Sequence, residues 1–574
     1  KWVMPKLYSS DLETLLPNQE DDKLFVNVLN INNLVMDKHA DYALITIYLD
    51  NPNEYTITDV GIEDARAEIT RNVNTNGLTV IEFKMYPEKY LDSYKINKII
   101  YKDNDIKKTV DKDYKLEAIF YKNLSTFDDW QKVSKTVAEN YILTNDIDFT
   151  GKSRINTGVA FNRLETSTDE TTFSLKGINL EYKTNGSYYG LISKVVTSIK
   201  NIGFEDITIT NSSTAGNSFN NIMIYNYGIM SGVKFNNVTI DAPKKNFTAP
   251  IGDNFGTTIQ NITVKDVNIT GNQYSSGFIA RTSNSMTDKV DNINGENITI
   301  NANSHYTGGL FGFFQNSINN QEIRVYTNIN VKGSNITSKG NYTGGIAGYG
   351  DCNNCSVENT TVIGTQFVGG IAGQTRQYYT YDAVVKASTI EGSNSYVGGI
   401  FGYTNNAYDS FLMNSEVHGT SANTYGVGGI TGYKNGWTIY RCGVLDSLIS
   451  NEGTETGGFT GRLTSGNYYD SFVSNSVITG SSETGGLVGK QTASGIYYSR
   501  IMNSVVNSTG KNAGGLVGHY NNDNESNGYN EGYIREVTLE NVDVSANSNA
   551  GGLIGTITED IFYPNRIRRL YFSG

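Results

Sequence analysis

Apolar and polar residues alternate along short stretches of the first 122 residues, where charged residues are also denser than in the rest of the chain. Because the side chains of a strand point alternately to its two faces, strands are expected at residues 24–28, 42–49, 78–83 and 114–120. Asn76-Gly77 separates two such stretches, and this dipeptide is typical of a two-residue hairpin turn. The pattern predicts a small antiparallel β-sandwich over residues 1–122.

A short amphipathic helix is expected next, in a linker over residues 123–150. Ser125 is placed to cap its first turn. The apolar stripe of this helix would consist of Trp130, Val133 and Val137. We expect the helix to cover the open strand edge at the start of the repeats that follow.

From residue 151 onward the pattern repeats itself. One repeated unit is an Asn or Asp between two apolar residues, recurring about every 30 residues. Its members are Asp206, Asn237, Asp266, Asn297, Asn328, Asn359, the variant Ser388, Asn414, Asp446, Asn475, Asn503 and Asn541. The other unit is Gly-Gly-apolar-x-Gly, and it recurs from Gly308 to Gly555.

This period predicts an all-β fold, a right-handed parallel β-helix of about 12 coils of ~30 residues over residues 151–574. Each coil would stack on the previous one at ~4.8 Å, and neighbouring coils would bury one another's apolar residues. We expect the unit glycines to supply positive-φ corners and close backbone approach. We expect the Asn and Asp side chains to hydrogen-bond backbone at a turn.

The residue after the last glycine of each unit forms a candidate ridge along the coils. In coil order these residues are Phe313, Tyr349, Gln374, Tyr403, Tyr433, Arg462, Lys490, His519 and Thr556. The ridge would be aromatic in its middle and basic towards its end, which suits a glycan or a protein partner. The candidate partner-binding residues are Tyr349, Tyr403, Tyr433, Arg462 and Lys490. The alternative is that these side chains merely cover a turn.

Charge and hydropathy limit the classes of partner that the chain is expected to bind. The chain of 574 residues has a formal net charge of −12, which argues against nucleic acid. It holds no apolar run long enough to span a membrane. The chain starts at Lys1 without a signal peptide and stops abruptly at Gly574, so we expect a piece of a longer protein.

Catalytic and metal-binding patterns are absent from the sequence. Cys352 and Cys355 form C-x-x-C, but a zinc site would need two more ligands. Solvent-facing thiols or a strained local disulfide are expected instead. The sequence has no His-Glu-x-x-His, no Gly-x-Ser-x-Gly elbow between a strand and a helix, and no G-x-x-x-x-G-K-[ST]. We therefore expect no catalytic residue, metal site or cofactor site in this chain.

Two groups of residues resemble a known family. Gly-Gly-Leu-Val-Gly at Gly485 and Gly514, and Gly-Gly-Ile-Ala-Gly at Gly344 and Gly369, resemble the GLUG repeat of bacterial surface proteins. The stretches Phe-Asp-Asp-Trp at 127–130 and Tyr-Ile-Leu-Thr-Asn-Asp-Ile-Asp-Phe at 141–149 add a second likeness. They resemble the segment that opens the β-helical region of the IgA1-protease-like zinc metallopeptidases of Gram-positive bacteria.

The chain departs from that family at two places. Relatives often carry Asp-Gly-x-Gly-His where this chain has Leu-Lys-Gly-Ile-Asn at 175–179. The His-Glu-x-x-His of the family's peptidase is also missing, so the resemblance implies a zinc-binding catalytic domain beyond Gly574.

The resemblance implies a non-catalytic scaffold and substrate-recognition region of a secreted or cell-surface zinc metallopeptidase. Its expected partners are a host glycoprotein of immunoglobulin or mucin type, or its glycan, and the protein's own downstream catalytic domain. Two alternatives stay open. One is a stand-alone bacterial surface adhesin or fibre, and the other is a carbohydrate-active β-helix, which would need paired carboxylates.

Overall fold

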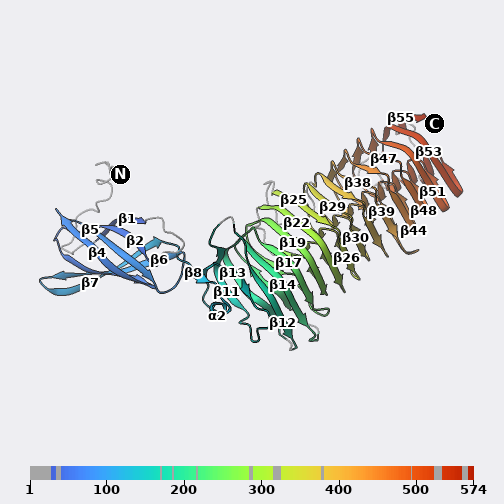
Figure 1. The fold of residues 1–574 in the computed structure, drawn as a ribbon. Coiled ribbons are helices and arrows are strands. Elements are labelled where there is room, and N and C mark those ends of the chain that lie inside the picture. Colours follow the sequence, from blue (N-terminus) through green and yellow to red (C-terminus); the bar gives the residue numbers. More distant parts are fainter. Residues whose placement is uncertain are drawn as a thin grey trace. The chain divides into compact units, whose positions relative to one another are not determined.

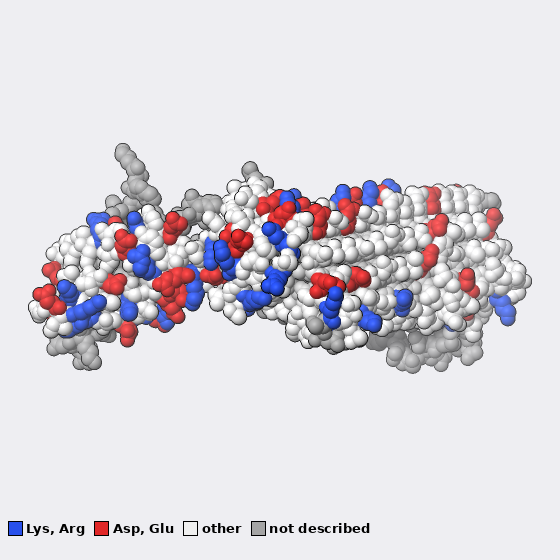
Figure 2. Space-filling model, turned by 60° about the horizontal axis from the view of Figure 1, so that its bottom comes forward, with Lys and Arg blue, Asp and Glu red and all other residues white. Residues whose placement is uncertain are grey.

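The computed structural model describes residues 27–33, 41–168, 171–183, 186–214, 218–282, 289–314, 325–375, 380–492, 494–521, 533–558 and 567–573. The chain divides into two compact units (Figure 1): Lys1–Leu124 with Ala138–Ile142, and Ser125–Val137 with Leu143–Gly574. Charged side chains of both signs are spread over the first unit in Figure 2, whereas the later coils of the second unit show few on that face.

The first unit is one antiparallel sheet with the strand order β1-β2-β5-β4-β3-β6-β7. Its strands are β1 (Asn27–Asn33), β2 (Ala43–Asp50), β3 (Thr56–Glu63), β4 (Ala65–Thr75), β5 (Leu78–Pro87), β6 (Ser93–Asp103) and β7 (Ile106–Glu117). Asn76 and Gly77 have φ of +52° and +82° and form the predicted tight turn between β4 and β5.

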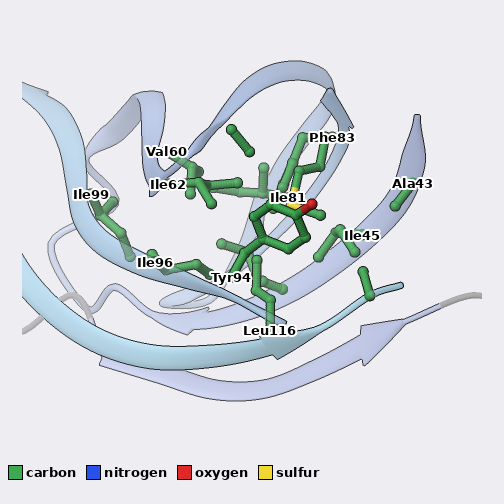
Figure 3. Packing of buried hydrophobic residues seen from close by; sticks show 14 of the residues in the cluster. Ala43, Ile45, Val60, Ile62, Ile81, Phe83, Tyr94, Ile96, Ile99 and Leu116 are labelled. Carbon is green, nitrogen blue, oxygen red and sulfur yellow. The ribbon is translucent and has the colours of Figure 1, made fainter. Parts of the chain in front are cut away.

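This sheet folds around one apolar core (Figure 3). Ile45, Ile81, Phe83, Ile96 and Leu116 are buried together there, because alternate residues of their strands point to the same side. The predicted small antiparallel domain is confirmed, and its strands form a single hydrogen-bonded sheet. The strand expected at residues 24–28 lies mostly outside the described residues.

The second unit is a parallel β-solenoid of about 13 turns, as the repeat predicts. The strands in register with the glycine units are β15 (Phe219–Asn226), β18 (Ile251–Asn254), β20 (Ser275–Ser276), β21 (Ile279–Thr282), β23 (Thr307–Gly308), β24 (Phe311–Phe314), β27 (Thr343–Gly344), β28 (Ala347–Tyr349), β31 (Val368–Gly369), β32 (Ala372–Gln374), β35 (Val397–Gly398), β36 (Phe401–Thr404), β40 (Tyr425–Gly428), β41 (Thr431–Lys434), β45 (Thr460–Leu463), β49 (Val488–Thr492), β52 (Val517–Asn521) and β54 (Ile554–Thr558).

The remaining strands of the chain are β8 (Lys122–Leu124), β9 (Glu139–Leu143), β10 (Ile147–Asp148), β11 (Val159–Thr166), β12 (Phe173–Tyr182), β13 (Tyr188–Lys200), β14 (Ile202–Asn211), β16 (Ile229–Ser231), β17 (Lys234–Asp241), β19 (Thr258–Gly271), β22 (Lys289–Ala302), β25 (Val325–Lys332), β26 (Asn335–Ser338), β29 (Cys355–Glu358), β30 (Thr361–Gly364), β33 (Ala383–Lys386), β34 (Thr389–Gly392), β37 (Ala407–Tyr408), β38 (Phe411–Met413), β39 (Glu416–Gly419), β42 (Thr438–Tyr440), β43 (Gly443–Leu445), β44 (Leu448–Gly457), β46 (Asn467–Tyr469), β47 (Phe472–Ser474), β48 (Val477–Gly485), β50 (Gly495–Tyr497), β51 (Arg500–Gly514), β53 (Ile534–Gly551) and β55 (Ile567–Ser573). Strands of successive coils pair in parallel, so equivalent residues form columns along the solenoid.

A short helix, α2 (Phe127–Gln131), lies at the start of the solenoid. Its N-cap is Thr126 and not Ser125 as predicted, because Thr126 and Asp129 form a reciprocal capping box. The Thr126 hydroxyl accepts from the Asp129 amide at 3.2 Å, and the Asp129 carboxylate accepts from the Thr126 amide at 3.0 Å. Ser125 donates to the same carboxylate.

The helix packs on the first coil through Trp130. This side chain is fully buried, and its ring centroid lies 5.5 Å from that of Phe149 and 5.8 Å from that of Phe161. Val133 and Val137 both lie beyond the helix, which ends at Gln131; Val133 is buried and Val137 is 40% exposed. Of the predicted apolar stripe, only Trp130 is therefore in the helix.

The predicted Asn/Asp column is present at a corner of the solenoid. Asn475 and Asn503 lie opposite each other in adjacent coils, with φ of +49° and +47°, a conformation that Asn and Asp tolerate better than other non-glycine residues. The side chains bond to one another and not to backbone as predicted. Asn237 donates to Asp206 at 2.6 Å, and Asn541 donates to Asn503 at 3.0 Å.

Two predicted members of this column lie elsewhere. Asn328 is opposite Asn292 in a second column of positive-φ residues, and Gly333 takes its place at the first corner. In the coil of Ser388 the corner residue is Ala387, with φ of +50°. Ser388 is the next residue and is buried. The slip at Asn328 arises because each coil has two such corners with similar local sequence. The slip at Ser388 is one residue within the same corner, because the corner residue there is alanine instead of Asn or Asp.

The residue after the Asn/Asp corner forms an internal hydroxyl ladder. In each step a backbone N–H donates to the hydroxyl of the next coil at 3.0–3.3 Å. The accepting residues are Ser334, Thr360, Ser388, Ser415, Ser447, Ser476 and Ser504. At the second corner Cys442 takes the same role, since its Sγ accepts from the Ser410 amide at 3.4 Å. These bonds satisfy backbone groups that the corners remove from the strand pairing.

The unit glycines are required by space and not by backbone conformation. Gly486 and Gly515 do not have positive φ, so the predicted positive-φ corners are wrong there. The predicted close approach is confirmed, because a Cβ on Gly486 would lie 2.1 Å from the carbonyl oxygen of Gly515 in the next coil. A Cβ on Gly515 would lie 2.2 Å from the oxygen of Gly552.

We predict that Gly486→Val lowers the free energy of unfolding by about 3 kcal/mol, because the new side chain must push two coils apart. Gly552→Val is the matched control, since a Cβ there meets nothing within 4 Å. Urea unfolding followed by circular dichroism measures both. Equal stability of the Gly486→Val variant and the wild type would contradict the close-approach explanation.

Candidate functional site

The structure places the five predicted ridge residues in one column. Tyr349 lies opposite Gln374, which lies opposite Tyr403. The column then continues coil by coil through Tyr433, Arg462 and Lys490. All of these side chains are partly exposed, so the ridge exists as a continuous surface feature.

A second column of aromatic residues runs beside the ridge. This aromatic ladder consists of Phe219, Phe247, Tyr274, Tyr306, Tyr342, Phe367 and Tyr396. Successive ring centroids are 4.5–5.3 Å apart, and the rings are nearly parallel as far as Phe367. From Phe247 to Tyr396 each member has φ between +52° and +65°.

Positive φ in an aromatic residue is strained, at a cost of about 1–2 kcal/mol. Ring stacking contributes about 0.5–1.5 kcal/mol per pair beyond area burial. The two effects are similar in size, so the stack offsets much of the strain at these corners. The aromatic ladder is therefore a structural element of the coils as well as a surface feature.

The ladder and the ridge meet edge to face in several coils, whereas Tyr396 stacks on Tyr433 at 4.7 Å and 24°. The Tyr306 and Phe313 rings are 5.0 Å apart at 85°, and the Phe367 and Tyr403 rings are 6.3 Å apart at 89°. Within the ridge, Tyr403 and Tyr433 are 5.2 Å apart. We call the ladder and the aromatic ridge residues together the aromatic belt.

The belt presents ring edges and hydroxyls, because neighbouring rings cover most ring faces. Burial raises the pKa of Tyr306 and of Tyr403, and raises that of Tyr396 to about 12. These hydroxyls are therefore neutral at physiological pH. The Tyr403 hydroxyl donates to Oδ1 of Asn405 at 3.0 Å and can still accept a hydrogen bond.

The side chains at the basic end of the ridge are paired with nearby carboxylates. Glu455, which is 3% exposed, accepts from Nε of Arg462 at 2.5 Å and also from its Nη2. Nζ of Lys490 lies 3.9 Å from the same carboxylate. His519 pairs with Glu483 at 2.8 Å. Arg462 and Lys490 are thus internally compensated, which the sequence analysis did not anticipate.

Burial alone would raise the pKa of Glu483. The hydrogen bond with His519 and the nearby charge of Lys490 instead lower it below its ordinary value.

A buried lysine lies beside the ridge. Lys434 is fully buried, and its Nζ donates to the carbonyl oxygens of Gly436, Trp437 and Ser465 at 2.5, 3.1 and 3.2 Å. Because these acceptors are neutral, burial lowers the pKa of Lys434 to about 7.

Cys352 and Cys355 are joined by a disulfide and are buried. The expectation of solvent-facing thiols is therefore wrong, and the local disulfide is the alternative that the structure contains. Among the described residues no group of three or more His, Cys, Asp or Glu side chains could hold a metal ion.

The sequence does contain a signal for the aromatic ladder. Its residue stands two positions before the glycine pair in four consecutive units, at Tyr306, Tyr342, Phe367 and Tyr396. The same position holds Glu455 and Glu483 in later units. This position, read together with the one after the glycines, therefore marks both the aromatic ladder and the acidic partners of Arg462 and Lys490 in the sequence.

No known protein family, curated protein or solved structure matches the chain. The likeness to IgA1-protease-like peptidases therefore stays a prediction. In the part of the chain that the structure describes, no helix has the length and apolar character needed to cross a membrane.

We predict that the free energy of unfolding rises with pH because of Lys434. An unfolded lysine stays protonated up to about 10.5, whereas the folded one loses its proton at about 7. Between these values the unfolded state binds more protons, so stability should rise by up to about 1.4 kcal/mol per pH unit. Urea unfolding at several pH values between 7 and 9.5 should give a steeper slope for wild type than for Lys434→Met. Identical slopes would contradict the lowered pKa.

Proposed function

We propose that this chain is a non-catalytic recognition scaffold of a bacterial surface or secreted protein, and that its aromatic belt contacts a host glycoprotein. The observation that carries this proposal is the belt itself, a rigid band of partly exposed Tyr and Phe rings that continues over consecutive coils. The proposal includes a zinc peptidase domain elsewhere in the same protein, on the strength of the family resemblance alone.

The chemistry of the belt supports recognition. Tyrosine combines a large apolar ring with a hydroxyl, and few rotatable bonds need to be ordered when it binds. Here stacking already fixes the rings on strands and at corners, so little further entropy is lost on contact. Because edges and hydroxyls face outward, the belt favours hydrogen bonds to peptide groups or sugar hydroxyls over stacking against a sugar face.

The buried Cys352–Cys355 disulfide supports an extracellular location, since such bonds persist in oxidising compartments. A stand-alone adhesin would use the same belt, and a His-Glu-x-x-His in the same polypeptide distinguishes the two. We do not propose a carbohydrate-active enzyme, because Asp206 and Asp266 each accept from an Asn of the next coil and act as corner residues.

Replacing Tyr349, Tyr403 and Tyr433 together by Ala should weaken binding to the partner by at least ~2 kcal/mol. The three Tyr→Phe changes should cause a smaller loss, because the stacked rings stay and the hydroxyls go. Biolayer interferometry on immobilised serum immunoglobulin A1 and on mucin, each before and after deglycosylation, measures this. Trp437→Ala, an exposed aromatic outside the belt, is the control. If the folded triple Ala variant binds the partner as tightly as wild type, the belt residues only cover a turn and do not bind the partner.

We predict that the isolated chain does not cleave immunoglobulin A1, mucin or casein, with or without added zinc. The physical reason is that a catalytic zinc needs three protein ligands around an open position. Gel electrophoresis after overnight incubation checks this. Zinc-dependent cleavage that a chelator stops would contradict the non-catalytic role.

A further inference from the structure

A second aromatic surface lies on strands that do not belong to the belt. One of its columns consists of outward-facing tyrosines: Tyr381, Tyr408, Tyr440, Tyr469 and Tyr497. The Tyr469 and Tyr497 rings stack at 4.8 Å, and those of Tyr381 and Tyr408 at 4.9 Å. These residues stand just before the second positive-φ corner of their coils.

After that corner, aromatic side chains recur in the next outward-facing column, which also contains an arginine. Phe411, Gly443, Phe472 and Arg500 form the next column. The two Phe rings lean over the glycine between them, because a Cβ on Gly443 would lie 2.6 Å from Phe472 and 3.0 Å from Phe411. Met413, Leu445 and Met502 follow two positions later and are partly exposed too. Ring and thioether groups thus cover several adjoining coils here.

A hollow of about 380 Å³ opens in this surface. It lies between two adjacent coils and is lined by Asp470, Ser471, Phe472, Tyr498, Arg500 and Met502. Tyr498 is 49% exposed, and Phe472 forms part of the wall. The hollow therefore combines aromatic walls with one carboxylate and one guanidinium.

The two charged groups of the hollow are unpaired among the described residues. At two other steps of the same corner column, charges are matched between coils. Arg441 makes two bonds of 2.6 Å to Asp409, and Arg569 lies 2.6 Å from Glu536. No ion pair within 4.0 Å joins Asp470 or Arg500 to another described residue, although each lines the same hollow. Their hydrogen-bonding capacity is free for a ligand.

We infer that this hollow binds a neutral pyranose sugar of a glycan. The carboxylate of Asp470 accepts hydrogen bonds from sugar hydroxyls, and the guanidinium of Arg500 donates to neighbouring sugar oxygens. The rings of Phe472 and Tyr498 cover the apolar C–H face of the sugar. Because one negative and one positive group face the ligand, their charges cancel. An acidic sugar would meet the repulsion of Asp470.

The inference names a ligand class for the glycoprotein recognition proposed above, but it uses a separate surface. The hollow is built on β47, β51 and the corners before them, whereas the belt lies on the glycine-unit strands and the corners before those strands. Loss of one surface should therefore leave the other intact, and the two proposals can fail independently.

The test is binding to an array of neutral and sialylated oligosaccharides, followed by titration calorimetry with the best neutral hit. Asp470→Ala and Arg500→Gln should each raise Kd at least ~10-fold. Both residues are unpaired at the surface, so thermal unfolding should stay unchanged. Arg441→Gln, whose guanidinium is already paired with Asp409, is the matched control and should bind as wild type.

The belt variant with Tyr349, Tyr403 and Tyr433 changed to Ala should keep its affinity for the free oligosaccharide while losing affinity for the glycoprotein. Absence of neutral hits on the array, preference for sialylated glycans, or wild-type affinity of the Asp470→Ala variant would each overturn the inference. Glycoprotein binding that survives deglycosylation and depends on Asp470 would assign the hollow to a protein partner and overturn it as well.

Discussion

Parallel stacking of coils at one strand spacing is the constraint on which the rest of this structure depends. Because coils are ~4.8 Å apart, each residue lies on its equivalent in the next coil. The same spatial requirement therefore applies to the equivalent position of every coil. Glycine at Gly486 and Gly515 is what allows the spacing, since a side chain there would overlap the next backbone. Without this close approach neither the corners nor the columns would be in register.

Because the coils stack in register, equivalent residues form columns both in the core and on the surface. Hydroxyls one residue after the Asn/Asp corner accept from the preceding coil, and Cys442 substitutes for a serine in the equivalent place at the other corner. Aromatic side chains stack where positive φ would otherwise be costly. Charges follow the same rule, since Arg462 is balanced by Glu455 from the neighbouring column. Asp470 and Arg500 are exposed charges of adjacent coils, and no ion pair within 4.0 Å joins either to another described residue.

Much of this architecture could be predicted from the sequence, because a period near 30 residues with paired glycines leaves few ways to bury the apolar residues. The ridge was found from one position, the residue after the last glycine, and its column is in register as expected. Of the two reasons predicted for the glycines, close approach is confirmed and positive φ is wrong at Gly486 and Gly515, since sequence does not separate a need for positive φ from a lack of space. Asn328 was assigned to the wrong corner because two corners per coil share the same local pattern, and Ser388 is one residue off because alanine stands at its corner. The pairing of Arg462 with Glu455 follows only when a second position, two residues before the glycine pair, is aligned as well. The C-x-x-C spacing already offered the disulfide of Cys352 and Cys355 as one of two alternatives.

Cross-linking of cysteines placed on adjacent coils tests the central claim most directly. Val477 and Val505 lie opposite each other, and both point outward with 42% and 38% exposure. Cysteines at these two positions should form a disulfide readily under mild oxidation, because equivalent residues of stacked coils satisfy its geometry. Cysteines at positions 477 and 507, offset by two residues along the strand, should not. Equal cross-linking of the two pairs, or none in the opposed pair, would contradict the stacked register.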